Sequence, residues 1–151
     1  MASSLLLSIH LFAAAFWFGV LGVEFILEQG RTRSRDHGYT VADIHYNIDL
    51  YLETPAFITV LVTGLIMLNG HPLTGLYLIK VCAGFIAILG NVGCVYAIVC
   101  RKWAARVKDF PALVKYSYMV DKLSAVAVPA GFTALFIGFY LAHSVASSVS
   151  H

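Results

Sequence analysis

Charge is scarce in this chain of 151 residues. Charged residues make up 12% of it, against roughly 25% in soluble domains, and hydrophobic residues make up 60%. The mean hydropathy of +0.81 agrees with this composition. So little charge excludes a soluble globular domain. The net charge is only +2 and the cations border apolar segments, so we expect no nucleic acid partner.

Cysteine is also rare. The three cysteines are Cys82, Cys94 and Cys100, all within or at the end of one apolar segment. Their odd number and their spacing match neither a zinc site nor a c-type haem attachment site. We therefore interpret them as small, polarisable packing residues.

Long apolar runs are what the chain has instead. A helix needs about 20 mostly apolar residues to cross roughly 30 Å of hydrocarbon. By this criterion the membrane spans are 4–27, 54–70, 75–100 and 122–147. The sequence predicts a single all-α domain, an integral membrane four-helix bundle that runs up-down-up-down. The segment 101–122 alternates cations with aromatic residues and predicts a short amphipathic surface helix, interrupted at Pro111.

The distribution of cations predicts the orientation. Nine of the ten lysines and arginines lie in or beside two loops on the same side of the predicted bundle. They are Arg31, Arg33, Arg35, Arg101, Lys102, Arg106, Lys108, Lys115 and Lys122. Because basic loops stay in the cytoplasm, we expect both termini outside it. The expected location is the bacterial inner membrane, with the termini in the periplasm and the lipid bilayer as the surrounding partner.

Several polar residues fall inside the predicted spans. A charged side chain near the centre of a bilayer costs about 2.5–3.5 kcal/mol, so each one requires a partner or a function. Because successive spans alternate in direction, these residues separate by depth. The outer half receives His10, His71, Lys80 and His143, and the inner half receives Glu24, Glu53 and Asn91.

The histidines are candidate metal ligands. Imidazole suits iron, and a helix bundle can hold a porphyrin between facing helices. His10 is the first candidate for an axial ligand of haem b, and the alternative is an interfacial histidine bonded to a neighbouring helix. His71 and His143 are candidates for the second ligand, or else interfacial polar residues. Trp17 and Tyr140 are expected to pack the same pocket.

Lys80 and the acidic residues allow more than one role. Lys80 either extends toward the membrane surface as an anchor or binds a propionate or substrate carboxylate. Glu24 is either a hydrated carboxylate at the membrane edge or, with Glu53 and Asn91, part of a proton relay or cation site.

A further set of potential ligands precedes the second predicted span. His45, Asp49 and Glu53 are spaced four apart, so they share one face if a helix continues through them. Pro55 opposes that continuity. A metal site on this face is the alternative prediction to separate polar residues.

Three of the four spans carry short motifs. These are Ile9-His10-Leu11 with Phe16-Trp17-Phe18-Gly19, Thr54-Pro55-Ala56 with Thr63-Gly64, and Gly75-Leu76-Tyr77-Leu78-Ile79-Lys80. The set resembles the HemJ-type protoporphyrinogen oxidases, four-helix membrane proteins of haem biosynthesis. It is also similar in layout to the membrane domain of CopD-type copper proteins. The HemJ resemblance implies that His10 binds haem and that Lys80 is functionally important.

The chain also departs from the HemJ pattern. It has Glu24-Phe25 where the family has a Pro-Arg pair, and Asn91 where the family has a histidine. The last span reads Ala127-Val128-Pro129, without the family's acid. Losing an arginine and an acid removes groups that would handle substrate charge, so the scaffold is expected to support different chemistry.

The leading hypothesis is therefore a haem b-binding membrane oxidoreductase. It would oxidise protoporphyrinogen or transfer electrons with a quinone, with Lys80 and Glu24 as candidate catalytic residues. One alternative is a permease or handling protein for copper or another divalent cation. Another is a non-catalytic membrane subunit, with Gly90 and Gly93 facing a partner helix. A homo-oligomer or a partner membrane subunit is expected in either case.

Overall fold

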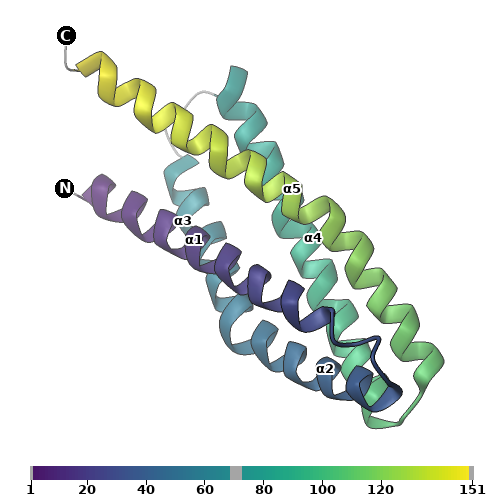
Figure 1. Ribbon diagram of the computed structural model, residues 1–151. Coiled ribbons are helices and arrows are strands. Elements are labelled where there is room, and N and C mark those ends of the chain that lie inside the picture. The colour runs from purple at the N-terminus through teal and green to yellow at the C-terminus, as the bar shows by residue number, and fades with distance from the viewer. Residues whose placement is uncertain (1, 69–72, 150–151) are drawn as a thin grey trace.

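The computed structural model is built from long helices (Figure 1). It describes the backbone of residues 2–68 and 73–149, and the side chains of residues 4–68 and 73–141. The helices are α1 (Ala2–Glu28), α2 (Arg35–Ile48), the π-helical η1 (Asp49–Glu53), α3 (Thr54–Leu68), α4 (Gly75–Arg106) and α5 (Phe110–Val149). The all-α prediction is confirmed.

Four helical rods result, because α2, η1 and α3 follow one another without a break. Each of the four is long and apolar enough to cross a membrane. They alternate in direction, so that α1 begins and α5 ends at the same end of the molecule (Figure 1). The predicted membrane-spanning four-helix bundle is thus confirmed, in the up-down-up-down arrangement.

The second rod begins at Arg35, well before the predicted start at residue 54. Pro55 lacks a backbone N–H and would break a regular α-helix. Here the turn before it is π-helical, with the Thr54 N–H donating to the carbonyl of Asp49, and this wider turn accommodates the proline. The helix is therefore continuous past His45.

The prediction of a surface helix over 101–122 is wrong. Instead, α4 continues to Arg106 and α5 begins at Phe110. Lys108 turns the chain between them with a positive φ of 56°. The side chain of Asp109 accepts a hydrogen bond from the Ala112 N–H (3.1 Å), and Pro111 lies in the first turn, where a missing N–H costs nothing.

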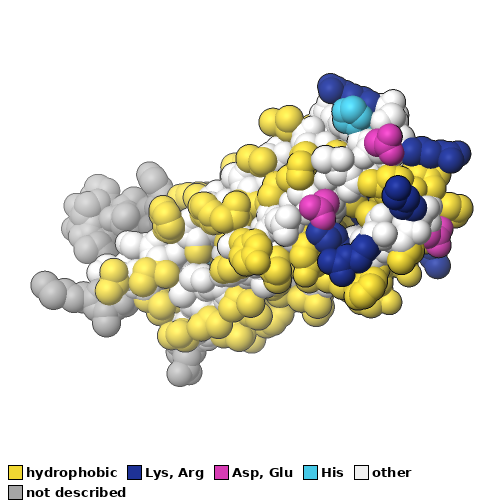
Figure 2. Space-filling model, turned by 90° about the horizontal axis from the view of Figure 1, so that it is seen from below, with side chains coloured by type: hydrophobic (Ala, Val, Ile, Leu, Met, Phe, Trp, Pro, Cys, Tyr) yellow, Lys and Arg dark blue, Asp and Glu magenta, His cyan; other side chains and the backbone are white. Residues whose placement is uncertain are grey.

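The charged side chains gather at one end of the molecule, which we call the basic end (Figure 2). At 1.5 Å per residue, α4 is about 48 Å long, which exceeds the roughly 30 Å of hydrocarbon. An ion pair between Arg31 Nη2 and Asp121 Oδ2 (2.5 Å) closes the basic end. The hydrogen bond to Asp121 raises the pKa of this guanidinium above its usual range. The opposite end is the termini end.

Small residues bring α4 and α5 together. A Cβ on Gly90 would lie 2.7 Å from the Cβ of Ala127, and one on Gly93 would lie 3.1 Å from Leu123. Close backbone approach of this kind is how helices associate in membranes. These two glycines therefore pack against α5 of the same chain and do not face a partner helix.

Substitution of Gly90 by alanine should destabilise the α4–α5 pair. The added methyl cannot fit without moving Ala127, and overpacking costs about 1–3 kcal/mol. Gly22→Ala is the matched control, because nothing lies within 4 Å of a Cβ there. Thermal unfolding in detergent should show a lower midpoint for Gly90→Ala alone; equal midpoints would contradict this packing.

Candidate functional site

An apolar cavity of about 160 Å³ lies among the four rods, toward the termini end. Its wall includes His10 and Trp17 from α1, Met67 from α3, Lys80 from α4 and Phe139 from α5. A cavity of roughly 150 Å³ with apolar walls holds a benzene molecule. This cavity therefore offers space for one ring-sized apolar group beside an imidazole and an ammonium.

His10 is fixed against α3. Its Nδ1 lies 2.8 Å from the hydroxyl of Thr63, and that hydroxyl donates its proton to the carbonyl of Thr59 (2.5 Å). The His10 Nδ1 is therefore the donor in the first bond, which leaves Nε2 with its lone pair. A Cβ on Gly64 would lie 3.3 Å from the Cε1 of His10, so a larger residue there would require the ring to shift by a few tenths of an ångström.

The geometry of His10 is compatible with both of its predicted roles, an interfacial histidine and an axial ligand of haem. A hydrogen bond to a neighbouring helix is what an interfacial histidine makes, and α3 supplies it. The same bond is also the contact that orients a metal-ligating imidazole and fixes its tautomer.

Lys80 lines the same cavity from α4. Its stem lies on Gly138, where a Cβ would be 3.3 Å from the lysine Cε, and its Nζ lies 5.8 Å from the ring centre of Tyr77. Within the part of the chain whose side chains are described, no carboxylate forms an ion pair with Lys80. The cavity thus contains a lysine amine that has no acidic partner among the described side chains.

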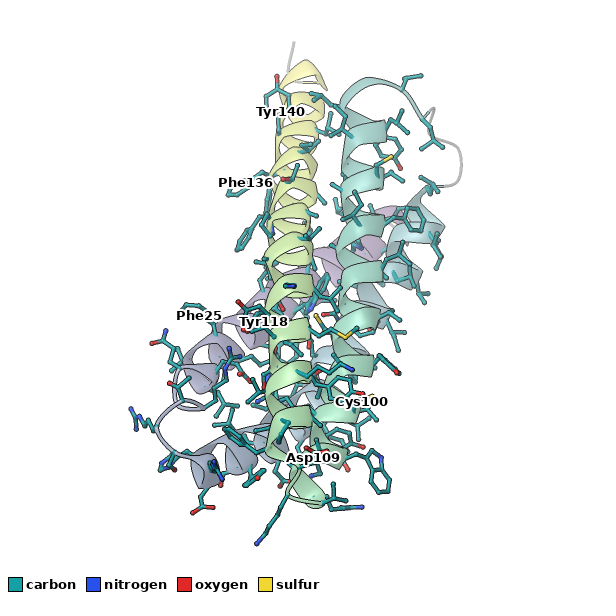
Figure 3. All side chains as sticks on the ribbon, turned by 90° about the vertical axis from the view of Figure 1, so that its right-hand side faces the viewer. Phe25, Cys100, Asp109, Tyr118, Phe136 and Tyr140 are labelled. Atoms are coloured by element: carbon teal, nitrogen blue, oxygen red, sulfur yellow. The ribbon has the colours of Figure 1, made fainter. Side chains whose placement is uncertain are left out.

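The other predicted pocket residues lie at different places. Trp17 is buried in the cavity wall. Tyr140 does not line the cavity; the residue is 64% exposed. Figure 3 shows it on the outside of α5. His71 and the side chain of His143 lie outside the described residues, so their role as second ligands stays a prediction.

A second group of polar side chains lies closer to the basic end, and we call it the polar cluster. It consists of Glu24 and Glu28 from α1, His45 from α2, Asp49 and Glu53 from η1, and Arg101 from α4. All of them are buried except Glu28, whose side chain is 15% exposed. Four carboxylates here face one guanidinium and one imidazole.

Glu28 joins the cluster to the basic end. Its carboxylate accepts a hydrogen bond from His45 Nδ1 and lies 2.8 Å from Arg101 Nη1. Arg31 Nη1 donates to its other oxygen (2.8 Å). No sequence pattern connects Glu28 with Arg101, because Arg101 was expected to be one of several topology-setting cations.

Glu53 joins the cluster to the cavity. The indole Nε1 of Trp17 donates to Glu53 Oε1 (2.9 Å), and the same indole ring forms part of the cavity wall. Glu24, Asp49 and Glu53 interact with one another electrostatically. The predicted grouping of Glu24 with Glu53 is therefore found. Asn91 is also buried, but its Nδ2 has no hydrogen-bond partner among the described residues.

Comparison of the chain with protein-family models, with curated proteins and with solved structures finds no match. The resemblance to HemJ-type and CopD-type proteins therefore stays a prediction.

Proposed function

We propose that the chain is a HemJ-like, haem b-binding membrane oxidoreductase. One observation carries the proposal: an apolar cavity contains both the His10 imidazole and the Lys80 ammonium, which no described carboxylate neutralises. Haem b has an apolar macrocycle, an iron that accepts imidazole, and propionates that accept an ammonium. Its chemistry matches this set of groups.

The donor groups fit haem, and the volume of the cavity sets a condition. About 160 Å³ is below the roughly 300–1,000 Å³ typical of ligand pockets. A whole tetrapyrrole therefore requires α1 and α3 to stand further from α4 and α5 at the termini end. Helix pairs packed mainly within themselves can separate in this way: α4 packs chiefly on α5, and α1 on α3.

The chain's own residues have distinct roles in this proposal. When bound, haem supplies one-electron redox chemistry. His10 would hold the iron through Nε2, while Thr63 keeps the ring in place. Lys80 would bind a propionate. Trp17 closes the cavity on the side of the polar cluster.

The substrate in this proposal is a porphyrinogen or a quinone, both of which exchange protons together with electrons. The polar cluster extends from the basic end to Trp17, so it supplies groups that can hold such protons. Glu24 and Glu53 would serve as carriers. By the positive-inside rule, the basic end would lie in the cytoplasm. The membrane in this proposal is a bacterial inner membrane.

An absorption spectrum tests the proposal. The full chain should be purified in detergent from cells with ample haem, then measured before and after reduction with dithionite. We expect a Soret band and separate α and β bands on reduction. A colourless protein that also fails to bind added haem would contradict the proposal.

Lys80→Met should weaken haem binding without abolishing it. A hydrogen bond to a charged group contributes about 1.5–3 kcal/mol, which corresponds to roughly 10- to 100-fold in affinity. Titration of haem-free protein with haem measures this change. Lys80→Arg keeps the charge and should retain most of the affinity. Equal affinity for Lys80→Met and the parent chain would exclude the propionate contact.

A further inference from the structure

The geometry points to a second, separate site: Glu24, His45 and Asp49 bind a divalent first-row transition ion such as Mn²⁺, Fe²⁺ or Zn²⁺. These three residues come from α1, α2 and η1. Each offers one ligand atom, and the three atoms lie within 4.8 Å of one another. All three side chains are buried.

The distances lie close to those around a shared ion, one within the expected range and one 0.2 Å above it. His45 Nε2 lies 3.2 Å from Asp49 Oδ1 and 3.6 Å from Glu24 Oε2. Ligand atoms bonded to one ion at about 2.1 Å, at octahedral or tetrahedral angles, lie about 3.0–3.4 Å apart. The three groups are therefore positioned for coordination with little rearrangement.

Hydrogen bonding does not account for these carboxylates. Glu24 and Asp49 are 5% and 2% exposed, yet Glu24 Oε1 and both carboxylate oxygens of Asp49 have no hydrogen-bond partner within the described chain. His45 is close enough to Asp49 but is not aligned to donate to it. Unpartnered carboxylate oxygens are costly when buried, and a bound cation would satisfy them.

Glu28 prepares His45 for this role. It accepts the hydrogen bond from Nδ1 of His45, and it is held in turn by Arg31 and Arg101. With Nδ1 turned to Glu28, Nε2 is the nitrogen that faces Glu24 and Asp49, and an ion bound there would take the place of any proton on it. A carboxylate that orients a histidine in this way is the usual outer contact of a metal-ligating imidazole.

The ligand types select the class of ion. One imidazole with two carboxylates suits Mn²⁺, Fe²⁺ or Zn²⁺, whereas Mg²⁺ and Ca²⁺ prefer oxygen alone and Cu⁺ prefers sulfur. The nearby thiol of Cys94 instead contacts the hydroxyl of Ser124 (3.6 Å).

Equilibrium dialysis followed by elemental analysis tests this site. The full His10→Ala chain is purified in detergent, stripped with EDTA, and dialysed against Mn²⁺ alone or Zn²⁺ alone. Because this chain lacks the proposed haem ligand, the result is independent of whether the haem proposal holds. We expect one ion per chain for at least one of the two metals.

Variants locate the ion. Asp49→Asn and Glu24→Gln should each abolish stoichiometric binding, and Glu28→Gln should weaken it about 10- to 100-fold. Asp43→Asn and His37→Ala change exposed residues of α2 and should bind as the parent does. If Asp49→Asn or Glu24→Gln elutes as aggregate, ion binding by Glu28→Gln tests the site instead, because that variant keeps both proposed carboxylate ligands.

Two results would overturn the site. The first is that neither ion binds the stripped His10→Ala chain, as expected if His45 is an imidazolium held only by ion pairs. The second is binding that Asp49→Asn and Glu28→Gln leave unchanged, which would place the ion on exposed carboxylates.

Discussion

Replacing Arg101 with methionine is expected to destabilise the protein by about 3–5 kcal/mol. The guanidinium is 1% exposed and lies 2.8 Å from Glu28 within the polar cluster. Without it, the cationic or imidazole partners left to the four carboxylates among the described residues are His45 and, at the edge, Arg31. Removing one partner of a buried ion pair costs this much because the remaining charge stays buried and unpaired.

Lys102→Met provides the matched control, since it removes the neighbouring cation from α4. Lys102 pairs with Asp43, whose side chain is 58% exposed, and exposed ion pairs contribute about 0–1 kcal/mol. In mixed detergent micelles, the free energy of unfolding should be far lower for Arg101→Met than for Lys102→Met. Glu28→Gln added to Arg101→Met should recover part of the loss. Similar losses for the two single variants would show that Arg101 does not stabilise the cluster.

His10→Ala is expected to remove nearly all bound haem. The substitution deletes the one described imidazole in the cavity wall. Haem iron depends on its axial ligand, and an alanine at this position offers none. The measurement is the haem content of purified protein by absorbance, relative to protein concentration. His37→Ala, at an exposed histidine of α2, should keep the parent value.

Thr63→Val separates ligation from general loss of structure. It keeps the His10 ring but removes its hydrogen-bond acceptor, so haem affinity should fall about 10-fold, the lower end for loss of an outer contact. A normal haem spectrum in His10→Ala would mean that another residue holds the iron.

Much of the fold was predictable from the sequence because the burial of apolar residues in a bilayer dominates it. Long apolar runs must span a bilayer, and their alternating direction then determines the depth of every polar residue. That reasoning placed His10 and Lys80 together and Glu24 and Glu53 together, as the structure does.

The centre of the polar cluster was harder to predict from the sequence. His45 and Asp49 join it only because a π-helical turn carries the second rod past Pro55, and proline normally predicts the opposite. The spacing of His45, Asp49 and Glu53 was the only available signal. The ion pair between Glu28 and Arg101 joins residues far apart in the chain, so it depends on packing that no local pattern encodes. Tyr140 was expected in the pocket from its helical face alone, and the rotation of α5 leaves it exposed.

In the proposed function, the cavity between His10 and Lys80 holds haem iron. The most direct test is an anomalous difference map, collected at the iron absorption edge from crystals of the purified full chain. We expect a peak in this cavity at bonding distance from His10 Nε2. Absence of iron there, in crystals that contain stoichiometric haem, would contradict it.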